Sequence, residues 1–491
     1  MKINIPKKLD IVTLIYIALF ILMIIRLLNI CLLNAVTSDN YFLINTGKYI
    51  IENKEIPTMN IWTMHPDFKI VIQQWLCCVE NYIAYNIAGN LGLVVITIIH
   101  TIILNILLIK FTSLYTDNKR IIVIALCLSN YFASYFISAR PSLVTISILT
   151  YELIQLELWR RSSKDKKSNI KLLINLAMIS LLHINYHSAL WLMDILFILP
   201  YMVPAIWEVN RHNIKESLIN TDSKMLLASI ITIIASSLIN PNGIKSITYL
   251  GNSAGMMNID KGIIELQPWN LNHICSIIII VIMMIYSVYI YKQKYKCDKV
   301  LVYLTVGTFI LSVLYRRNTW MIIFSLIMLL TDLMKDKSHK EYRVSENKCV
   351  IAVSIFIVVM VMYTFMIINV GIKYNINEHD TVTSPVRAIE YLDEDCVIYN
   401  DFCNGAYLEL NGYKTYIDAR PELYMKSINK KADIYQEWVD LLNGKIDIPR
   451  FIDKYKFNTF IVENGTVLDC YLHYNNNYTE VLKDNGYTVY R

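Results

Sequence analysis

A set of basic side chains lies where long apolar segments of the sequence end. Arg140, Arg316 and Arg317 each stand at such an end. A guanidinium binds phosphate through paired, charge-assisted hydrogen bonds. Three arginines at one face of a membrane, with few carboxylates beside them, therefore favour a phosphate site. The alternative is that each arginine reaches an ordinary anionic lipid headgroup, which its long stem allows.

Asp39 and His187 are the residues that would carry protons at such a site. Asp39 lies about six residues beyond the first apolar segment, where a carboxylate could accept a proton from a hydroxyl nucleophile. It equally suits the polar start of a helix that begins near Tyr41. His187 lies in a turn between two apolar segments, where it could donate to phosphate or orient the acid. The alternative for His187 is an interfacial histidine whose hydrogen bonds are satisfied.

Two further groups could contact a sugar or an acceptor. Glu265 and Trp269 combine a carboxylate with an aromatic platform, although a tryptophan here also fits an interfacial aromatic belt. Asp418 and Arg420 are two residues apart at the end of an expected strand, so their side chains point to one face. With Asp401 they either bind the acceptor, or the Asp418–Arg420 pair fixes a soluble domain to the membrane-embedded part.

The elements that position these residues are mostly membrane helices. The chain has 491 residues, of which 55% are hydrophobic and 18% are charged, and its mean hydropathy of +0.40 is too high for a soluble protein of this length. The apolar residues are bunched into runs of roughly 17 to 23, long enough to cross a bilayer as helices. About eleven such spans are predicted, near residues 11–33, 91–111, 121–137, 142–158, 170–184, 189–207, 225–239, 273–291, 300–314, 320–333 and 349–370.

Lysine and arginine gather in alternate connections between the predicted spans. The basic connections are residues 2–8, 119–120, 160–167, 211–215, 292–299 and 335–343. The positive-inside rule places these connections and the N-terminus in the cytoplasm. An odd number of spans then places everything after residue 370 outside the cell membrane. We expect a multi-pass plasma-membrane protein whose first apolar segment is retained.

The sequence divides into a transmembrane domain, residues 1–370, and a small extracytoplasmic α/β domain, residues 371–491. The first external loop, at about 34–90, ends in QQWLCCVENYIAYNIAG, which predicts an amphipathic helix on the membrane surface. In the last domain, CVIYN, KTYID and NTFIVEN predict strands, and KADIYQEWVDLLNG and IPRFIDKYKF predict helices. The closing TEVLKDNGYTVYR fits a strand pair or a helix–strand unit.

Several short motifs in a fixed order resemble bacterial polytopic membrane proteins of the GT-C glycosyltransferase superfamily. These are relatives of protein mannosyltransferases and of lipid-A aminoarabinose transferases. Two positions depart from the pattern: Asn40 follows Asp39 where many members have a second acid, and Asn404 stands where the tail usually has glycine. The matching pieces are Asp39 and Tyr41 with TGKYI, IP at 56–57, QQWL at 73–76, ARP at 139–141, His187, NPNG at 240–243, ELQPW at 265–269, Arg316-Arg317 and the tail NGAYLELNGYKTYIDARPELY.

The resemblance implies an enzyme that moves a sugar from a polyprenyl-phosphate donor to an envelope glycan, lipid or protein outside the cell, with inversion. Asp39 would be the catalytic base. Donor phosphate would be held by Arg140, His187, Arg316 and Arg317, and sugar or acceptor by Glu265, Trp269, Asp401, Asp418 and Arg420.

The alternatives are a lipid-linked glycan transporter or flippase, a polysaccharide polymerase or ligase, and a non-catalytic envelope scaffold. No metal site is predicted from spacing, and a divalent cation is left open because Asp39, Glu265 and His187 are all ligand types. The net charge of +6 does not indicate nucleic-acid binding.

Overall fold

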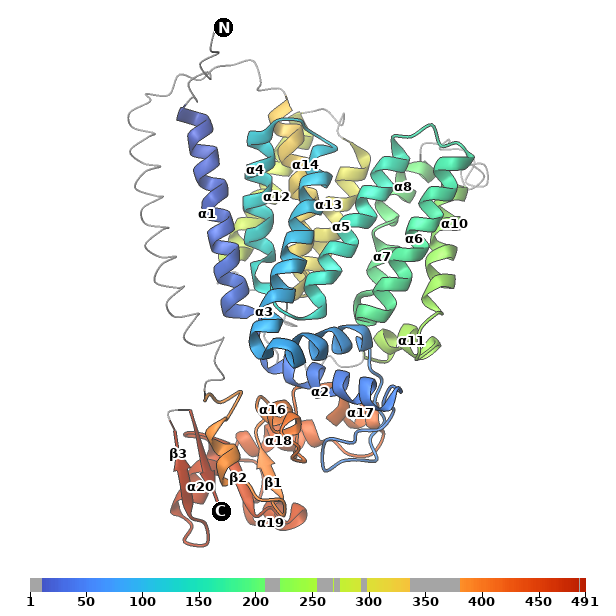
Figure 1. The fold of residues 1–491 in the computed structure, drawn as a ribbon. Coiled ribbons are helices and arrows are strands. Elements are labelled where there is room, and N and C mark those ends of the chain that lie inside the picture. Colours follow the sequence, from blue (N-terminus) through green and yellow to red (C-terminus); the bar gives the residue numbers. More distant parts are fainter. Residues whose placement is uncertain are drawn as a thin grey trace.

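The computed structural model describes residues 11–207, 221–253, 268, 274–292, 298–335, 380–484 and 486–491. A bundle of long helices carries a compact α/β domain at one end (Figure 1). The first ten predicted spans all fall on helices, and the eleventh, near 349–370, lies outside the described residues. The helices of the bundle are α1 Ile11–Asn34, α2 Ser38–Asn53, α3 Trp75–Ser113, α4 Lys119–Ala133, α5 Pro141–Arg160, α6 Lys166–His187, α7 Leu192–Leu196, α8 Leu199–Trp207, α10 Thr221–Ser237, α11 Ile244–Ser253, α12 Ile274–Lys292, α13 Lys299–Leu314 and α14 Ile322–Lys335.

Within the described residues, three helices are long and apolar enough to cross a membrane by themselves. They cover Ile15–Asn34, Trp75–Ser113 and Lys166–Leu190. The outer faces of the bundle expose large apolar side chains, such as Ile102 and Ile106 on α3. An apolar surface of this kind is stable against lipid and not against water, so the chain is a membrane protein.

Helix α3 has two parts that meet at a kink. Ala88 and Gly89 leave the helical conformation, and Gly89 combines a φ of 57° with a ψ of −141°, a backbone conformation that favours glycine. The part before the kink lies across the end of the bundle, whereas the part after it runs along the bundle (Figure 1). The first part is the segment that the sequence predicts as an amphipathic surface helix.

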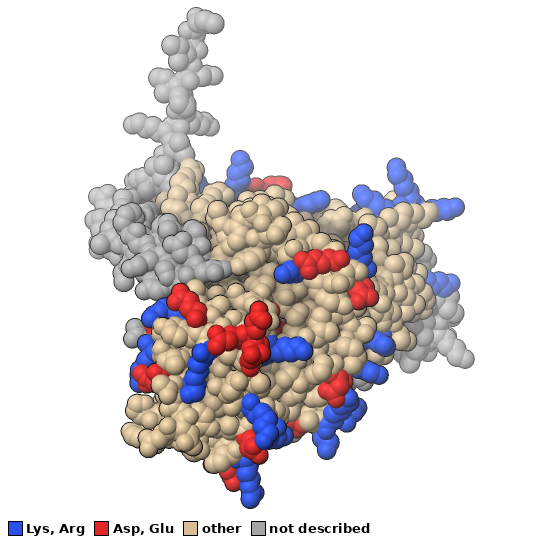
Figure 2. Space-filling model, turned by 60° about the horizontal axis from the view of Figure 1, so that its bottom comes forward, with Lys and Arg blue, Asp and Glu red and all other residues tan. Residues whose placement is uncertain are grey.

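The two ends of the bundle differ in charge. The basic ends of several helices meet where α1 begins: Arg120 at the start of α4 donates to Thr13 of α1 at 3.2 Å, and Arg160 at the end of α5 pairs with Asp298 at 2.8 Å. The α/β domain lies at the opposite end (Figure 1). Acidic and basic side chains are interspersed over the face that this domain presents (Figure 2). The charge asymmetry found in the sequence thus separates the two ends of the folded bundle.

The C-terminal domain is built on a mixed four-stranded sheet with the order β1-β2-β4-β3. β1 pairs parallel with β2, and β4 pairs antiparallel with both β2 and β3, so the closing segment forms a strand pair. The elements are η6 Arg387–Tyr391, β1 Ile398–Asn400, α16 Gly405–Leu410, η7 Pro421–Tyr424, α17 Lys426–Asn429, α18 Ile434–Leu442, α19 Ile448–Tyr455, β2 Thr459–Glu463, α20 Val467–Tyr474, β3 Glu480–Lys483 and β4 Tyr487–Tyr490.

The prediction that KTYID forms a strand is wrong, because the structure has no strand at residues 414–418. The backbone of this segment is bound instead by the buried side chain of Asn400, which accepts from Tyr416 N at 2.8 Å and donates to Ile417 O at 2.7 Å. The one ladder contact of the segment is an isolated bridge between Thr415 and Thr63 of the first loop. A side chain therefore satisfies the polar groups that a neighbouring strand would otherwise bind.

The first loop and the C-terminal domain share one hydrophobic core. Phe68 of the loop packs in the same buried cluster as Tyr399 and Phe460 of the domain. Tyr41 of α2 meets the ring of Tyr407 of α16 edge-on, with centroids 5.0 Å apart. Although the sequence assigns the loop to the transmembrane domain, the loop attaches the α/β domain to the bundle.

Candidate active site

A cavity of about 240 Å³ opens at the end of the bundle that carries the C-terminal domain. Five separate segments supply its charged side chains and its histidine: α2, the start of α5, the end of α6, the 3₁₀ helix η5 (Arg316–Met321) and η7. Polar groups such as Gln73 and Asn318 complete the wall. The charged side chains and the histidine of the cavity are Asp39, Arg140, His187, Arg317 and Glu422.

Asp39 and Arg140 form an ion pair inside this cavity. The carboxylate Oδ2 lies 2.6 Å from Arg140 Nη2, and the two side chains remain 25% and 35% exposed. Helix α2 begins at Ser38, and Asn40 rather than Asp39 reaches back to its cap, accepting from Thr37 N at 2.7 Å. Asp39 is therefore in the first turn of a helix that begins three residues earlier than expected; it does not cap this helix, and its carboxylate is directed to Arg140.

Asn40 holds the two halves of this pair together. Its buried amide donates to Asn81 Oδ1 at 2.9 Å and to Ala139 O at 2.8 Å. The segment before α5 is also bound through Ala139 N to Ala35 O at 3.1 Å. Asn40 thus links α2, α3 and the Arg140 segment, because its amide oxygen accepts at the cap while its amide nitrogen donates to the other two segments.

The neighbouring arginines point in different directions. Arg317 lines the cavity, whereas Arg316 lies outside it and donates through Nε to Pro268 O at 3.3 Å on the exposed surface. His187 also lines the cavity, and its Nδ1 lies 2.8 Å from the hydroxyl of Thr145. The structure therefore assembles Asp39, Arg140, His187 and Arg317, and leaves out Arg316.

Glu422 is a cavity residue that the sequence reasoning missed. It lies in η7, which follows directly after Arg420, and so belongs to the same DARPELY segment that was singled out for its Asp-x-Arg pair. The sequence did contain an indication of this role, because Glu422 is the third charged residue of the DARPELY motif. Because Glu422 comes from the C-terminal domain, this domain forms part of the cavity wall.

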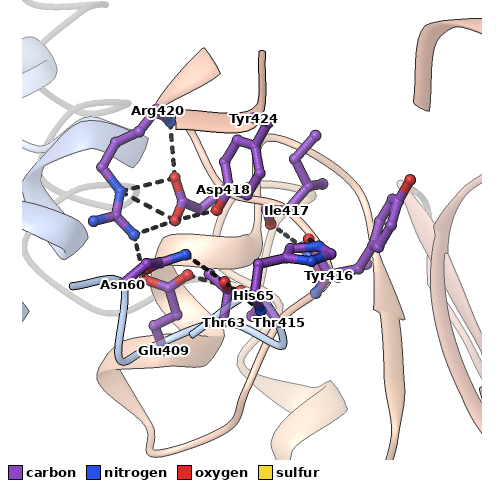
Figure 3. A network of polar contacts seen from close by, with 11 residues as sticks. Asn60, Thr63, His65, Glu409, Thr415, Tyr416, Ile417, Asp418, Arg420 and Tyr424 are labelled. Carbon is purple, nitrogen blue, oxygen red and sulfur yellow. Dashed lines mark hydrogen bonds and ion pairs between the residues drawn. The ribbon is translucent and has the colours of Figure 1, made fainter. Parts of the chain in front are cut away.

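Asp418 and Arg420 lie at the centre of a buried network beside this cavity (Figure 3). Asp418 accepts from Arg420 Nε at 2.9 Å and from the hydroxyl of Tyr424 at 2.7 Å, and Arg420 also pairs with Glu409 at 3.5 Å. Burial opposes ionisation of Asp418, but the Arg420 charge lowers the pKa of this carboxyl. Both charges are thus engaged by the protein itself.

Arg420 also joins the domain to the first loop and to α2. Its guanidinium carbon lies 5.4 Å from the ring centroid of Trp62 and 5.8 Å from that of Phe42. Such cation–π contacts are most stabilising when water is excluded. This geometry favours the structural alternative for Asp418 and Arg420, in which the pair fixes the domain to the bundle, over direct acceptor binding.

Asp401 is buried inside the domain and does not line the cavity. Its carboxylate accepts from Glu463 N at 2.7 Å and from the Tyr399 hydroxyl at 3.2 Å. Burial raises the pKa of Asp401 to about 6, even though these donors favour the charged form. Asp401 therefore stabilises the fold of the domain, like Asp418 and Arg420, and does not reach the cavity.

We expect the C-terminal domain to become more stable as the pH falls from 7 to 4.5. The folded-state pKa of Asp401 lies above its ordinary value of 3.8, so the folded state binds the proton more tightly in this window. About 2 kcal/mol of unfolding free energy is gained in this window, at 1.36 kcal/mol per pKa unit. Hydrogen exchange of the β2 amides at the two pH values measures this change in unfolding free energy. The gain should vanish in Asp401→Asn, and an equal pH dependence in both proteins would contradict the assignment.

Two of the predicted sugar-binding residues, Glu265 and Trp269, lie outside the described residues. In the described part of the chain, no group of three or more His, Cys, Asp and Glu side chains is arranged to hold a metal ion. A divalent cation held by Asp39, Glu265 and His187 stays the open alternative that it is in the sequence, because Glu265 lies outside the described residues.

Comparison with known proteins supports the fold. No protein-family model and no curated protein matches the chain. The fold is similar to that of a solved structure, the archaeal oligosaccharyltransferase AglB from Archaeoglobus fulgidus, in complex with an inhibitory peptide and a dolichol-phosphate. The TM-score is 0.52 at 11% identity, over 91% of this chain and 69% of that chain.

Proposed function

We propose that this protein transfers a sugar from a polyprenyl-phosphate donor to a cell-envelope acceptor at the cavity. The observation that carries the proposal is the meeting of Asp39, Arg140, His187 and Arg317 in one cavity of a GT-C-like fold. These residues come from four separate segments. A transferase of this kind needs a proton acceptor beside a phosphate-binding group, and the cavity contains both.

Arg140 and Arg317 are the groups proposed to hold the donor phosphate. Both line the cavity, and a pair of guanidiniums suits the negative charge that grows on the phosphate as the sugar leaves. The apolar helices of the bundle lie beside them, where a lipid chain is soluble. AglB is named as a complex with dolichol-phosphate, which is a phosphate on such a chain. Arg316 lies outside the cavity and is not kept in this role.

Asp39 and His187 are the two groups placed to take the proton from the acceptor hydroxyl. Asp39 is the base expected from the sequence, and its ion pair with Arg140 orients the carboxylate. Attack from the face opposite the phosphate would invert the anomeric carbon. Glu422 and Gln73 line the same cavity and are able to hydrogen-bond sugar hydroxyls.

The cavity is proposed to face the outside of the cell. The Lys- and Arg-rich helix ends lie at the opposite end of the bundle, which the positive-inside rule places in the cytoplasm. The protein would then be a multi-pass plasma-membrane enzyme whose acceptor is an envelope glycan, lipid or protein. The narrower relationship to protein mannosyltransferases and aminoarabinose transferases stays a proposal.

A non-catalytic scaffold is the second candidate, and one observation favours it. Asp39 and Arg140 satisfy each other's charge at 2.6 Å, so a purely structural role would explain both residues. A scaffold needs the pair only for stability. Loss of Asp39 would then change the amount of folded protein and leave the envelope chemistry intact.

The test replaces Asp39 with asparagine in a deletion strain of the native host. We expect one envelope sugar to disappear and its polyprenyl-phosphate donor to accumulate, as measured by mass spectrometry at equal membrane levels of protein. Asp67→Asn is the matched control, because Asp67 is an exposed carboxylate of the same loop, paired with Lys431. An unchanged glycan profile in Asp39→Asn, when deletion of the gene changes it, would favour the scaffold.

A further inference from the structure

A chain of hydrogen bonds runs from the cavity into the bundle. His187 Nδ1 lies 2.8 Å from Thr145 Oγ1, and the same hydroxyl lies 3.3 Å from His183 Nε2. His183 Nδ1 in turn lies 2.6 Å from Asp194 Oδ1. Thr145 belongs to α5, His183 to α6 and Asp194 to α7. A buried carboxylate, two imidazoles and a hydroxyl therefore form one continuous path that ends at the cavity.

The residues of this hydrogen-bonded path lie where side chains with only a packing role are seldom ionisable. The side chains of His183 and Asp194 are fully buried among apolar helices. The second oxygen of Asp194 has no hydrogen-bond partner among the described residues, nor has either carboxyl oxygen of nearby Glu152. Ionisable groups inside a membrane bundle are costly and occur mainly where protons or ions are handled.

We propose that His187 accepts the proton of the acceptor hydroxyl and that Thr145, His183 and Asp194 remove this proton from the cavity. The inference rests on the proposed sugar transfer and deepens it. Asp39 then acts by holding Arg140 against the donor phosphate. Thr145, His183 and Asp194 are positioning residues, because they act through His187.

A neutral His183 fixes which nitrogen of His187 is free. We assign the Nδ1 proton of His183 to the bond with Asp194 Oδ1, which leaves a lone pair on His183 Nε2. The single hydrogen of Thr145 is then assigned to His183 Nε2 or to Pro141 O, which lies 3.2 Å away. With this assignment His187 Nδ1 donates to Thr145, which leaves a lone pair on Nε2. The ring is therefore a base at the cavity and not a donor.

Charged side chains of both signs line the cavity beside His187. The guanidiniums of Arg140 and Arg317 form part of the same cavity wall. The carboxylates Asp39 and Glu422 line the same cavity, and Asp39 is neutralised by its partner Arg140. An Nε2 lone pair beside two guanidiniums is available when the acceptor hydroxyl attacks.

The proton transfer balances in one step along this path. The acceptor oxygen bonds to the anomeric carbon, and the bond from that carbon to the phosphate oxygen breaks with its electron pair on phosphate. The hydroxyl proton moves to His187 Nε2. The Nδ1 proton of His187 passes to Thr145, whose own proton passes to His183 Nε2. The resulting imidazolium is paired with Asp194, which stabilises the charge within the bundle.

The first test needs no substrate. Full-length protein with ¹⁵N-labelled histidine rings, in lipid nanodiscs, is compared by NMR with His187→Gln, which assigns one of the nine histidines. We expect His187 to be neutral at pH 7, with Nδ1 protonated and Nε2 bare. Thr145→Val should abolish this tautomer preference, and Thr145→Ser should keep it. A protonated Nε2 in the wild type, or an unchanged signal in Thr145→Val, would overturn the inference.

The second test measures transfer in the deletion strain that carries each variant. Thr145→Val, which keeps the shape and removes the hydroxyl, should slow the return of the missing envelope sugar by about 10²-fold, a usual contribution of a positioned proton acceptor. Thr145→Ser should retain the rate within about threefold. Wild-type rates in Thr145→Val would overturn the proton path and leave the transferase standing. If gene deletion itself changes no glycan, the proposed function fails, and the proton path has no reaction to serve.

Discussion

Replacing Arg317 with glutamine should lower sugar transfer by about 10²- to 10³-fold, the usual effect of removing one group that stabilises transition-state charge. Arg317 lines the cavity, where the leaving phosphate is proposed to gain negative charge. Glutamine keeps the length of the side chain and one donor but removes the positive charge. The rate is followed as the loss of polyprenyl-phosphate sugar in membranes of the deletion strain that carries the variant.

Arg316→Gln is the matched control for this experiment. The two arginines are adjacent, equally basic and at the same end of the bundle, but Arg316 donates to Pro268 O outside the cavity. We expect Arg316→Gln to stay within about threefold of the wild type, as for a surface cation. If both variants lose transfer equally, general attraction of anionic lipid would explain the arginines, and the directed phosphate site would be wrong.

Replacing Arg420 with methionine should destabilise the C-terminal domain by about 3–5 kcal/mol, the usual cost of removing one partner of a buried ion pair. Asp418 would lose its bonds from the guanidinium, and Glu409 would lose its only cation in the network (Figure 3). The contacts to Trp62 and Phe42 would be lost too. Hydrogen exchange of β1 and β2 in purified full-length protein measures the effect.

Arg450→Met gives the comparison for a surface pair in the same domain. The Arg450 side chain is 88% exposed and pairs with Asp447 at 3.3 Å. Exposed pairs contribute about 0–1 kcal/mol, so this variant should stay close to the wild type. Similar losses in the two variants would show that the buried network does not hold the domain together. A third variant with Arg420→Met, Asp418→Asn and Glu409→Gln should recover part of the stability, because no unpaired charge remains buried.

Glu422 connects this stability to the proposed reaction. The residue follows directly on the network, in η7, and reaches the cavity. A loosened network would therefore move one wall of the cavity as well as weaken the domain. Arg420→Met is expected to reduce transfer although Arg420 is not proposed to touch either substrate.

The local pattern of the sequence was enough to place most elements. The long apolar runs fall on helices because a backbone in lipid must satisfy its own polar groups, and a helix does so within one segment. CVIYN and NTFIVEN form β1 and β2, since each is a short β-rich run bounded by polar residues. KTYID has the same composition and fails, because Asn400 from another segment binds its backbone.

The sequence also showed which residues could bind a phosphate. It did not show how these residues are arranged in space. Asp39 and Arg140 are far apart in the chain and meet because Asn40 and the backbone of Ala35 both bind Ala139, the residue before Arg140. Which of two adjacent arginines enters the cavity depends on the phase of η5, where successive side chains point about 120° apart. The hydropathy pattern does not predict in which direction each of these side chains points.

Composition and periodicity thus determined that this protein is a membrane bundle with an α/β domain and basic groups at the ends of its spans. Only the tertiary structure decided that Asp418 and Arg420 are buried in the domain, that Glu422 lines the cavity, and that His187 is connected through Thr145 to His183 and Asp194. The physical reason is that hydropathy reports the average environment of a segment. Hydrogen bonds and ion pairs between distant segments depend on how the helices pack.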